Sequence, residues 1–546
     1  MDPPTRMSTG WDWLDRWCRR AAPVLAAAAT IAVFWLGMAY GSRAAGGADA
    51  FGYVSQAYLW LKGDLRIDHS WARRFDWPHR EESVRPLGYR WGEDRGAIVP
   101  TYAPGVPLIM AGFDRMFGTC GPYYVTPFFG ALLVAGTFLL GRRLSGSALT
   151  ASMAALLMAT SPAFLFNLMF PMSDIVTAML WTWVLVLLTW QGGAAAAAAG
   201  ILAGLAVLVR PNLVPLAIAG VAAAVLWSRD DATPVRRFGR LAAFGVWIVA
   251  ASLFIARLNH ALYGSAFESG YGATASLYAW SHLGTNLEHY AAWLTRSETP
   301  VFFIGILPVV SRRLRPAWLT RQVAAPLALF VAIVLVSYLF YLPFDEWWYL
   351  RFLLPAFPIL FLLVAIALER VTRAALPRWP SLAILTVVLL SVYRWGFADS
   401  RGLMRIGYDE QRYVAVGQYI ARALPANAIL LAMQHSGTIR YYAGRPTIRY
   451  DLFTPARLPT VVATLPDYGY RPYLVLEDWE EQEYRARMGS DSPIARLEMR
   501  VLAEMTAPVK VRIYDPQPAA AGAPPPDPIP IRPTRACVGP GGAWAH

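Results

Sequence analysis

The chain has 546 residues, of which 56% are hydrophobic and only 16% are charged, and its mean hydropathy is +0.37. This composition excludes an ordinary soluble protein and favours an integral membrane protein. The formal net charge of +13 would suit a nucleic-acid-binding protein in a soluble chain. In a membrane protein, arginine-rich cytoplasmic loops explain it without nucleic acid.

Long apolar runs predict eleven membrane spans along the chain. They cover residues 21–41, 122–141, 148–168, 173–190, 194–209, 212–227, 241–257, 299–311, 322–342, 352–368 and 380–396. The first run is longer than the apolar part of a usual signal peptide, so we expect it to be retained as a span. The run 299–311 is short for a crossing.

Arginine clusters orient these spans. With the N-terminus in the cytoplasm, every cluster falls in a cytoplasmic loop, as the positive-inside rule requires. The clusters are Arg142/Arg143, Arg236/Arg237/Arg240, Arg312/Arg313/Arg315/Arg321 and Arg370/Arg373/Arg378. The chain after about residue 397 then lies outside the cytoplasm, together with segments 42–121, 169–174, 258–298 and 343–351.

The first outer loop, residues 42–121, is far longer than a simple connection needs. Its tryptophans suit the lipid headgroup zone, where amphipathic helices lie flat; they are Trp60, Trp71, Trp77 and Trp91. Apolar residues at helical spacing predict such a helix over 50–61, and they are Phe51, Val54, Tyr58 and Leu61.

The pattern changes after residue 400 to short strands that alternate with helices. It predicts helices at Tyr408–Leu424 and Trp479–Met488, and strands at Ala428–Met433, Pro446–Tyr450, Tyr473–Leu476 and Val509–Tyr514. We therefore expect three parts: a membrane domain (1–400), a small extracytoplasmic α/β domain (401–515) and a disordered Pro-rich tail (516–546).

The cysteines and one histidine carry little functional signal. Cys18, Cys120 and Cys537 lie far apart and show no spacing typical of a disulfide framework or a zinc site. His435 follows a predicted strand, and without a placed partner it is expected to be structural or part of an acceptor surface rather than catalytic.

Two acids stand at outer ends of predicted spans. Asp49 follows the first span in GGADAFGY, and Asp174 lies in the outer turn FPMSD. A carboxylate beside a membrane must be solvated, paired or used. Each acid has a plain alternative as a helix N-cap, and the Asp49 side chain would then accept from the amide of Phe51 or Gly52. Their common location predicts that the two acids meet over one cavity.

Two arginines also lie at outer span ends, against the general bias. Arg210 occurs in LAVLVRPNLVP and Arg351 in DEWWYLRFLLPAFP. A guanidinium group suits phosphate oxygens, and lipid phosphates are available at this depth. The alternative is that each arginine reaches ordinary headgroups or pairs with Asp345 or Glu346.

An ordered set of motifs resembles the GT-C superfamily of polyprenyl-phosphate-dependent glycosyltransferases. The set comprises the acid after span one, YAPGVPLIM (102–110), LLGRRL (139–144), FPMSD, LVRPN and YLRFLLPAFP (349–358). The chain is most similar to the bacterial branch of aminoarabinose transferases and protein O-mannosyltransferases, glycosyltransferase family 39-like, over residues 10–400. The fold that this resemblance implies is a mainly α-helical membrane protein.

The resemblance implies roles for these residues. Asp49 would be the base or acceptor-orienting group, Asp174 a second catalytic acid, and Arg351 and Arg210 ligands of the donor phosphate. The remaining groove candidates are Tyr53, Tyr102, Tyr349, Arg85 and Arg90. The chain departs from relatives that have an Asp-Glu pair in the first loop or a Lys before the Pro-rich motif, so metal use and the phosphate contact stay open.

The predicted function is inverting transfer of a sugar from a polyprenyl phosphate to a glycan, lipid or protein acceptor. It would take place on the outer face of a bacterial cytoplasmic membrane. A divalent metal is the one candidate cofactor, and a DxD pair that would support it is absent from the sequence. A transporter or flippase of lipid-linked sugars and a scaffold with a partner-binding outer domain are the alternatives. Charges at span ends rather than mid-span, without internal repeats, favour the enzyme.

Overall fold

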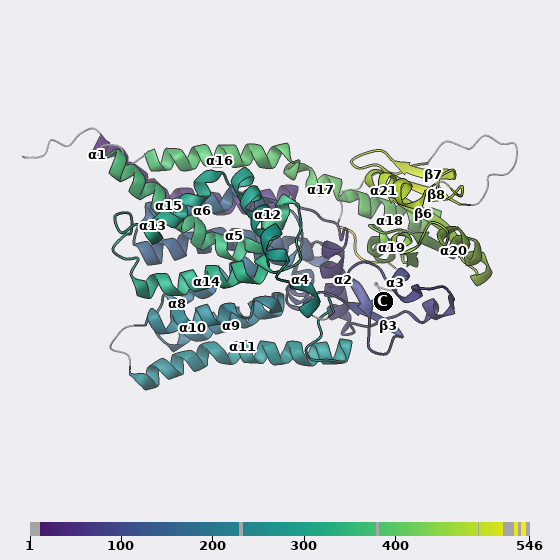
Figure 1. Ribbon diagram of the computed structural model, residues 1–546, viewed down its shortest axis with the longest axis horizontal. Helices are drawn as coiled ribbons and strands as arrows, with labels where there is room; N and C mark the ends of the chain where they lie inside the picture. The colour runs from purple at the N-terminus through teal and green to yellow at the C-terminus, as the bar shows by residue number, and fades with distance from the viewer. Residues whose placement is uncertain are drawn as a thin grey trace, which may run out of the picture. The chain divides into compact units, whose positions relative to one another are not determined.

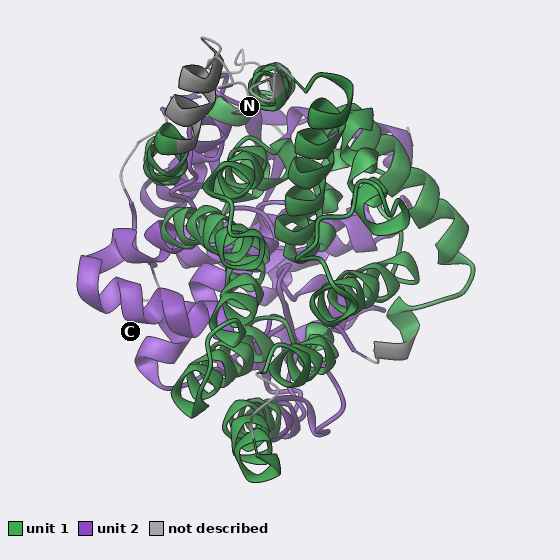
Figure 2. Ribbon diagram, turned by 90° about the vertical axis from the view of Figure 1, so that its left-hand side faces the viewer, with its two compact units in different colours: residues 1–39, 126–255, 274–404 green, residues 40–125, 256–273, 405–546 purple. Residues whose placement is uncertain are grey.

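The computed structural model describes residues 11–228, 233–272, 274–377, 382–489, 491–516, 529–532 and 537–541. The chain divides into two compact units, each assembled from segments that are far apart in the sequence (Figure 2). Unit 1 comprises residues 1–39, 126–255 and 274–404, and unit 2 comprises residues 40–125, 256–273 and 405–546.

Unit 1 is a helical bundle. Its helices are seen from the side in Figure 1 and along their axes in Figure 2, so most of them run roughly parallel or antiparallel. They are α1 (Trp11–Tyr40), α5 (Gly121–Ser145), α6 (Ala148–Ala159), α7 (Pro162–Leu168), α8 (Ser173–Leu188), α9 (Gly193–Val209), α10 (Leu216–Leu226), α11 (Pro234–Tyr263), α12 (His282–Ser297), α13 (Leu307–Val310), α14 (Arg321–Leu339), α15 (Phe357–Ala375) and α16 (Leu382–Ser400). The 3-10 segments η3 (Pro211–Leu213), η5 (Pro300–Ile306) and η6 (Trp347–Ala356) lie between them.

Some helices of this bundle start at a residue whose side chain caps the helix. The side chain of Ser147 accepts a hydrogen bond from the Thr150 amide at the start of α6, and Ser161 accepts one from Phe164 at the start of α7. Each cap satisfies a backbone N–H that the helix itself leaves without a partner. The Ser161 cap also marks the 59° bend between α6 and α7.

Six described helices are long and apolar enough to cross a membrane, and the bent pair α6–α7 would make a seventh. Large apolar side chains point outward on several of them, among them Ile31 of α1, Leu253 of α11 and Val392 of α16. Such exposure is expected against lipid. The chain is thus a multi-pass membrane protein. Four shorter apolar helices occupy the remaining predicted runs, and the count of eleven crossings stays a prediction.

Unit 2 contains a mixed sheet in the order β5-β4-β6-β8-β7-β9. Its strands are β4 (Ala428–Leu431), β5 (Thr447–Ile448), β6 (Arg471–Glu477), β7 (Arg500–Met505), β8 (Val511–Asp515) and β9 (Ile529–Pro530). Strand β4 is parallel to β5 and β6, whereas β8 is antiparallel to β6 and β7. The accompanying helices are α17 (Ile406–Asp409), α18 (Gln411–Ala423), α19 (Ser436–Ala443), α20 (Leu458–Thr464) and α21 (Asp478–Met488). The strands and helices predicted after residue 400 are all present within a few residues.

The first outer loop belongs to the same unit. It forms helices α2 (Asp49–Lys62), α3 (Arg80–Ser83) and α4 (Gly105–Phe117), and a small sheet in the order β1-β3-β2. These strands are β1 (Ile67–Asp68), β2 (Tyr89–Trp91) and β3 (Ala97–Pro100). The predicted helix over 50–61 is confirmed as α2.

The expectation that the tryptophans of the first outer loop lie at lipid headgroups is wrong for Trp71 and Trp77. Trp77 is buried in one hydrophobic cluster with Ile429 and Leu474 of the C-terminal sheet, and Trp71 packs against the same cluster. Helix α2 is buried over consecutive residues, from Ala50 to Ala57, rather than along one stripe. A helix lying flat on a membrane would instead expose one face.

A disulfide joins the first and last of the three chain segments that form unit 2. Cys120 and Cys537 are bonded, with their Cα atoms 5.3 Å apart, although 417 residues separate them in the sequence. This finding corrects the prediction of no disulfide, which rested on sequence spacing alone. The predicted disorder of 517–528, 533–536 and 542–546 falls outside the described residues.

Candidate functional site

Asp49 is the first residue of α2 and follows a turn that includes Gly46, Gly47 and Ala48. The Phe51 amide donates to the Gly46 carbonyl at 3.1 Å, and the Gly52 amide donates to the Ala48 carbonyl at 2.9 Å. Ala48 is the N-cap residue, and no side chain caps this helix. The cap interpretation of Asp49 is therefore wrong, because the two amides it would have satisfied bond to the backbone.

The Asp49 carboxylate is held by a tyrosine instead. The Tyr102 hydroxyl donates to Asp49 Oδ1 at 2.7 Å, and the ring of Tyr53 lies 4.5 Å from that of Tyr102. Gly52 permits this approach, because a Cβ there would overlap the Tyr102 ring. Burial and the nearby Asp49 charge raise the pKa of Tyr102 well above its usual value, so the phenol stays protonated and donates.

Arg90 ties the loop that follows α11 to this region. Its Nη2 lies 2.6 Å from Glu268 Oε1, and its Nη1 donates to the Ser269 carbonyl at 2.8 Å. The next two residues of the loop reach the Asp49 neighbourhood, since the ring of Tyr271 meets that of Tyr102 edge-on at 5.9 Å. The Arg90 charge is thus paired with a carboxylate of its own unit. Arg85 lies near Arg449, and burial lowers the pKa of its guanidinium group.

In unit 1, Asp174 and Arg210 form an ion pair. Asp174 lies in the first turn of α8 with its side chain only 2% exposed, and its Oδ1 is 2.7 Å from Arg210 Nη2. Arg210 also donates to Ser173 Oγ at 3.3 Å and to the Tyr338 hydroxyl at 3.2 Å. The N-cap of α8 is Met172, without a side-chain cap, so the cap interpretation of Asp174 is wrong as well.

Arg351 lies beside Met172, the N-cap residue of α8. Its Nη1 is 3.4 Å from Met172 Sδ, and its guanidinium carbon lies 5.0 Å from the ring centre of Tyr349. The guanidinium groups of Arg351 and Arg210 both face the Phe352 ring, at 5.4 and 5.8 Å from its centre. The structure therefore brings Arg351, Arg210 and Asp174 together around one aromatic side chain.

Sequence reasoning missed the neutral members of this cluster. They are Ser173, Asn212, Tyr338 and Phe352. Asn212 and Tyr338 share a hydrogen bond of 3.2 Å, and the Tyr338 ring stacks on Phe352 at 4.8 Å. Asn212 stands two residues after Arg210 in LVRPN and gave a weak signal, whereas Tyr338 lies in an apolar run and gave none. Among the described residues, no group of three or more His, Cys, Asp or Glu side chains is placed to hold a metal ion.

The fold that the order of motifs predicts is found among solved structures, because the chain is similar in fold to ArnT and to an archaeal oligosaccharyltransferase. The chain is similar to ArnT from Cupriavidus metallidurans in the apo state, with a TM-score of 0.51 and 14% identity over 90% of this chain and 97% of that one. The same protein bound to undecaprenyl phosphate matches with a TM-score of 0.50 and 13% identity, over 92% of this chain and 98% of that one.

A third similar structure is the archaeal oligosaccharyltransferase AglB from Archaeoglobus fulgidus, in complex with an inhibitory peptide and a dolichol-phosphate. It matches with a TM-score of 0.52 and 13% identity, over 92% of this chain and 75% of that one. No protein-family model matches the sequence, and no curated protein matches it significantly. At these identities the similarity is one of fold.

Proposed function

We propose that the protein is a membrane glycosyltransferase that moves a sugar from a polyprenyl-phosphate donor to a glycan, lipid or protein acceptor. The observation that carries the proposal is the Asp49–Tyr102 hydrogen bond of 2.7 Å in a chain with the GT-C fold. Asp49 is only half-buried. A carboxylate that is rigidly held and still reached by solvent suits a general base.

In the proposed reaction, an acceptor hydroxyl or amine loses its proton to the Asp49 carboxylate. Its oxygen or nitrogen forms a bond to the anomeric carbon as the bond from that carbon to the phosphate oxygen breaks. The electron pair of the broken bond stays on the polyprenyl phosphate. Attack from the face opposite the leaving group inverts the anomeric centre. Tyr102 orients the base through its hydrogen bond.

Arg351 and Arg210 are the proposed ligands of the donor phosphate. Guanidinium groups bind phosphate oxygens through charged hydrogen bonds and stabilise the negative charge that develops on the leaving group. Asp174 pairs with Arg210 at 2.7 Å and in this proposal fixes its orientation. Tyr349, whose ring lies beneath the Arg351 guanidinium, borders the donor. Two similar solved structures contain undecaprenyl phosphate and dolichol-phosphate, which supports a lipid phosphate as the donor carrier.

We further propose that the protein resides in a bacterial cytoplasmic membrane with its N-terminus inside and unit 2 outside. The arginine clusters between spans support this orientation. The Cys120–Cys537 disulfide supports it as well, because disulfides persist in oxidising compartments outside the cytoplasm.

The test is transfer by Asp49→Asn in detergent-purified protein. Asparagine keeps the shape of the side chain and still accepts from Tyr102, but it takes no proton, so we expect turnover to fall by at least about a hundredfold. The matched control is Asp114→Asn, because Asp114 also accepts a tyrosine hydroxyl, that of Tyr58 at 3.0 Å, within the same unit. Full activity of Asp49→Asn would overturn the role of this residue.

A further inference from the structure

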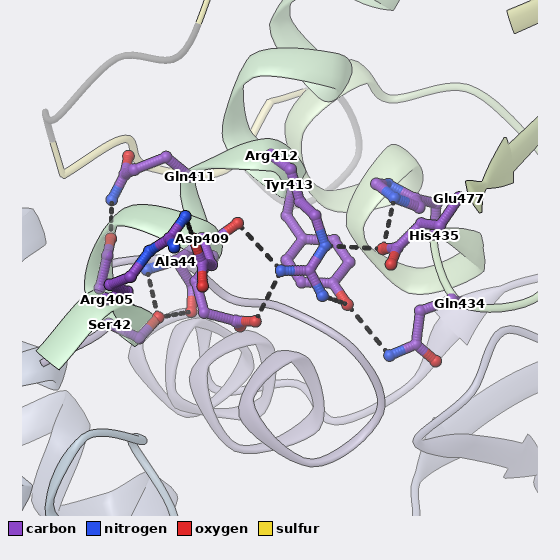
Figure 3. Close-up of polar contacts among 12 residues, drawn as sticks. Ser42, Ala44, Arg405, Asp409, Gln411, Arg412, Tyr413, Gln434, His435 and Glu477 are labelled. Atoms are coloured by element: carbon purple, nitrogen blue, oxygen red, sulfur yellow. Dashed lines mark hydrogen bonds and ion pairs between the residues drawn. The ribbon is translucent and has the colours of Figure 1, made fainter. Parts of the chain in front are cut away.

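A network of charged side chains is buried in unit 2, apart from the residues assigned above (Figure 3). Arg412, near the start of α18, donates from Nε to Glu477 Oε1 at 2.7 Å and from Nη1 to Glu410 Oε1 at 3.0 Å. His435 Nε2 lies 3.1 Å from Glu477 Oε1. The side chains of Glu477 and His435 are 1% and 0% exposed. Breaking such a buried set leaves an uncompensated charge, so its geometry is strongly fixed.

Two neutral groups extend the network toward the first loop. The Tyr413 hydroxyl accepts from Arg412 Nη2 at 2.9 Å and from Gln434 Nε2 at 3.0 Å. The backbone of Gln434 is also fixed, because its main-chain N–H donates to Glu480 Oε1 at 3.2 Å. Figure 3 shows Tyr413 and Gln434 joined to Arg412 in one continuous chain of contacts. Their positions are thus set by the ions behind them.

These groups pack directly against the turn that precedes Asp49. A Cβ at Gly46 would overlap the Glu410 carboxylate and the Tyr413 ring, and a Cβ at Gly47 would lie 3.1 Å from Gln434 Nε2. Gly47 has φ +57°, a conformation that glycine adopts without strain. The Gly46 carbonyl in turn accepts the Phe51 amide at the start of α2. A shift of Tyr413 or Gln434 would therefore displace this turn and, with it, Asp49 at the start of α2.

We infer that Tyr413 and Gln434 are positioning residues for Asp49, held in place by the buried ions Arg412, Glu410 and Glu477. The α/β region of unit 2 then acts on sugar transfer without touching substrate, by fixing the turn Gly46–Gly47. This inference rests on the proposed function of Asp49. His435 supports the arrangement from behind, since burial lowers the pKa of its ring and keeps it neutral beside Glu477.

The primary test measures the turn itself and needs no sugar donor. Tyr413→Phe keeps the ring but removes the oxygen that joins Arg412 and Gln434. We expect hydrogen exchange of the Phe51 and Gly52 amides to accelerate severalfold, up to about tenfold, because a lost hydrogen bond favours local opening. Tyr484→Phe is the control, since Tyr484 is buried in the same unit and donates to the Ile494 carbonyl at 3.0 Å. Unchanged exchange in Tyr413→Phe would overturn the inference.

A second variant acts from the other side of the contact. Gly46→Ala inserts a methyl group against Glu410 and Tyr413, whereas Gly112→Ala in α4 meets nothing within 4 Å and serves as its control. We expect Gly46→Ala to accelerate the same amide exchange and to lower kcat at least about tenfold with the donor KM unchanged, because a displaced base weakens transition-state contacts only. An equal rise in KM, or an unchanged kcat, would contradict a positioning role.

The outcomes separate the two claims. If Asp49→Asn abolishes transfer while Gly46→Ala and Tyr413→Phe leave kcat and amide exchange unchanged, the positioning inference fails alone. If Asp49→Asn remains active, the proposed function of Asp49 fails, whatever the amide exchange shows.

Discussion

Each unit of the molecule buries an arginine between carboxylates or polar groups, but the two networks end differently. In unit 1, Arg394 of α16 lies 3.0 Å from Glu298 Oε2, and Ser161 Oγ donates to Glu298 Oε1 at 2.6 Å. In unit 2, the network around Arg412 ends on Tyr413 and Gln434 (Figure 3). The first set closes on groups that hold helices together, whereas the second reaches the turn before Asp49.

The difference separates stability from positioning. Arg394 Nη1 donates to the Leu157 carbonyl of α6 and its Nη2 to the Glu298 carbonyl after α12, so one side chain joins three helices at the bend between α6 and α7. Loss of this contact should loosen the bundle as a whole. Loss of the Tyr413 contact should leave unit 2 folded and move one residue. A buried ion network therefore points to a functional role only where one of its residues contacts the candidate site, as Tyr413 contacts the turn before Asp49.

The largest expected effect comes from breaking the unit 1 pair. Glu298→Ala leaves the Arg394 charge buried with 1% of its side chain exposed, and we expect a loss of about 3–5 kcal/mol in the free energy of unfolding. Chemical denaturation in detergent micelles measures it. Arg373→Ala is the control, because its pair with Glu369 is half-exposed and should cost less than about 1 kcal/mol. Equal losses of unfolding free energy in the two variants would show that the buried ion pair stabilises the bundle no more than the half-exposed pair does.

The next effect is a pH dependence in unit 2. Burial raises the pKa of Glu480 from 4.5 to about 7, so between these values the folded state holds a proton that the unfolded state releases. Stability from this group is present below pH 4.5 and is lost as pH rises to about 7. Glu480→Gln lacks this titrating group. The free energy of unfolding of the variant, minus that of the wild type, should therefore increase by about 3 kcal/mol as the pH rises from 4.5 to about 7.

Thermal and chemical denaturation between pH 4.5 and 8 checks the sign of this change. Glu483→Gln serves as the control, since Glu483 is exposed on the same helix, α21. A flat difference between Glu480→Gln and wild type would show that Glu480 ionises normally in the folded protein.

The disulfide provides a smaller test that is confined to unit 2. Cys120→Ser/Cys537→Ser removes a link between the turn that connects α4 to α5 and the C-terminal tail, and we expect a loss of about 2–3 kcal/mol in the free energy of unfolding. The effect arises because the bond restricts the unfolded chain. Protease protection of each unit, read by mass spectrometry, should fall in unit 2 and stay unchanged in unit 1. A loss in both units would mean that the disulfide stabilises the protein globally.

Much of this architecture is readable from local pattern, because its elements carry their own signals. Strand β6 was predicted from a buried apolar run, and α21 from a charged stretch after it. Helix α19 was missed, since Ser436–Ala443 is only eight residues long and is buried at every position, which is too short a stretch for helical periodicity to identify. The Cys120–Cys537 bond was missed because two cysteines 417 positions apart in the sequence give no local signal.

The candidate site likewise has features that the sequence reveals and features that only the fold reveals. Asp49, Asp174, Arg210 and Arg351 are chemically unusual at a membrane boundary, and this made them visible. The Tyr102 hydrogen bond depends on contact between residues 53 positions apart, and that between Arg412 and Glu477 on residues 65 positions apart. Only the folded chain brings such partners together, so the sequence predicts Asp49 and Tyr102 as separate site residues but not the hydrogen bond that joins them.

The most direct test of the central claim is release of polyprenyl phosphate by the purified protein. The protein is incubated with a panel of polyprenyl-phosphate sugars and a cell-envelope extract as the acceptor source, and the lipid product is followed by mass spectrometry. The account predicts release from at least one donor by the wild-type protein and by Asp114→Asn, and at least about a hundredfold slower release by Asp49→Asn. Equal release by Asp49→Asn and wild type, or none by the wild-type protein from any donor, would contradict it.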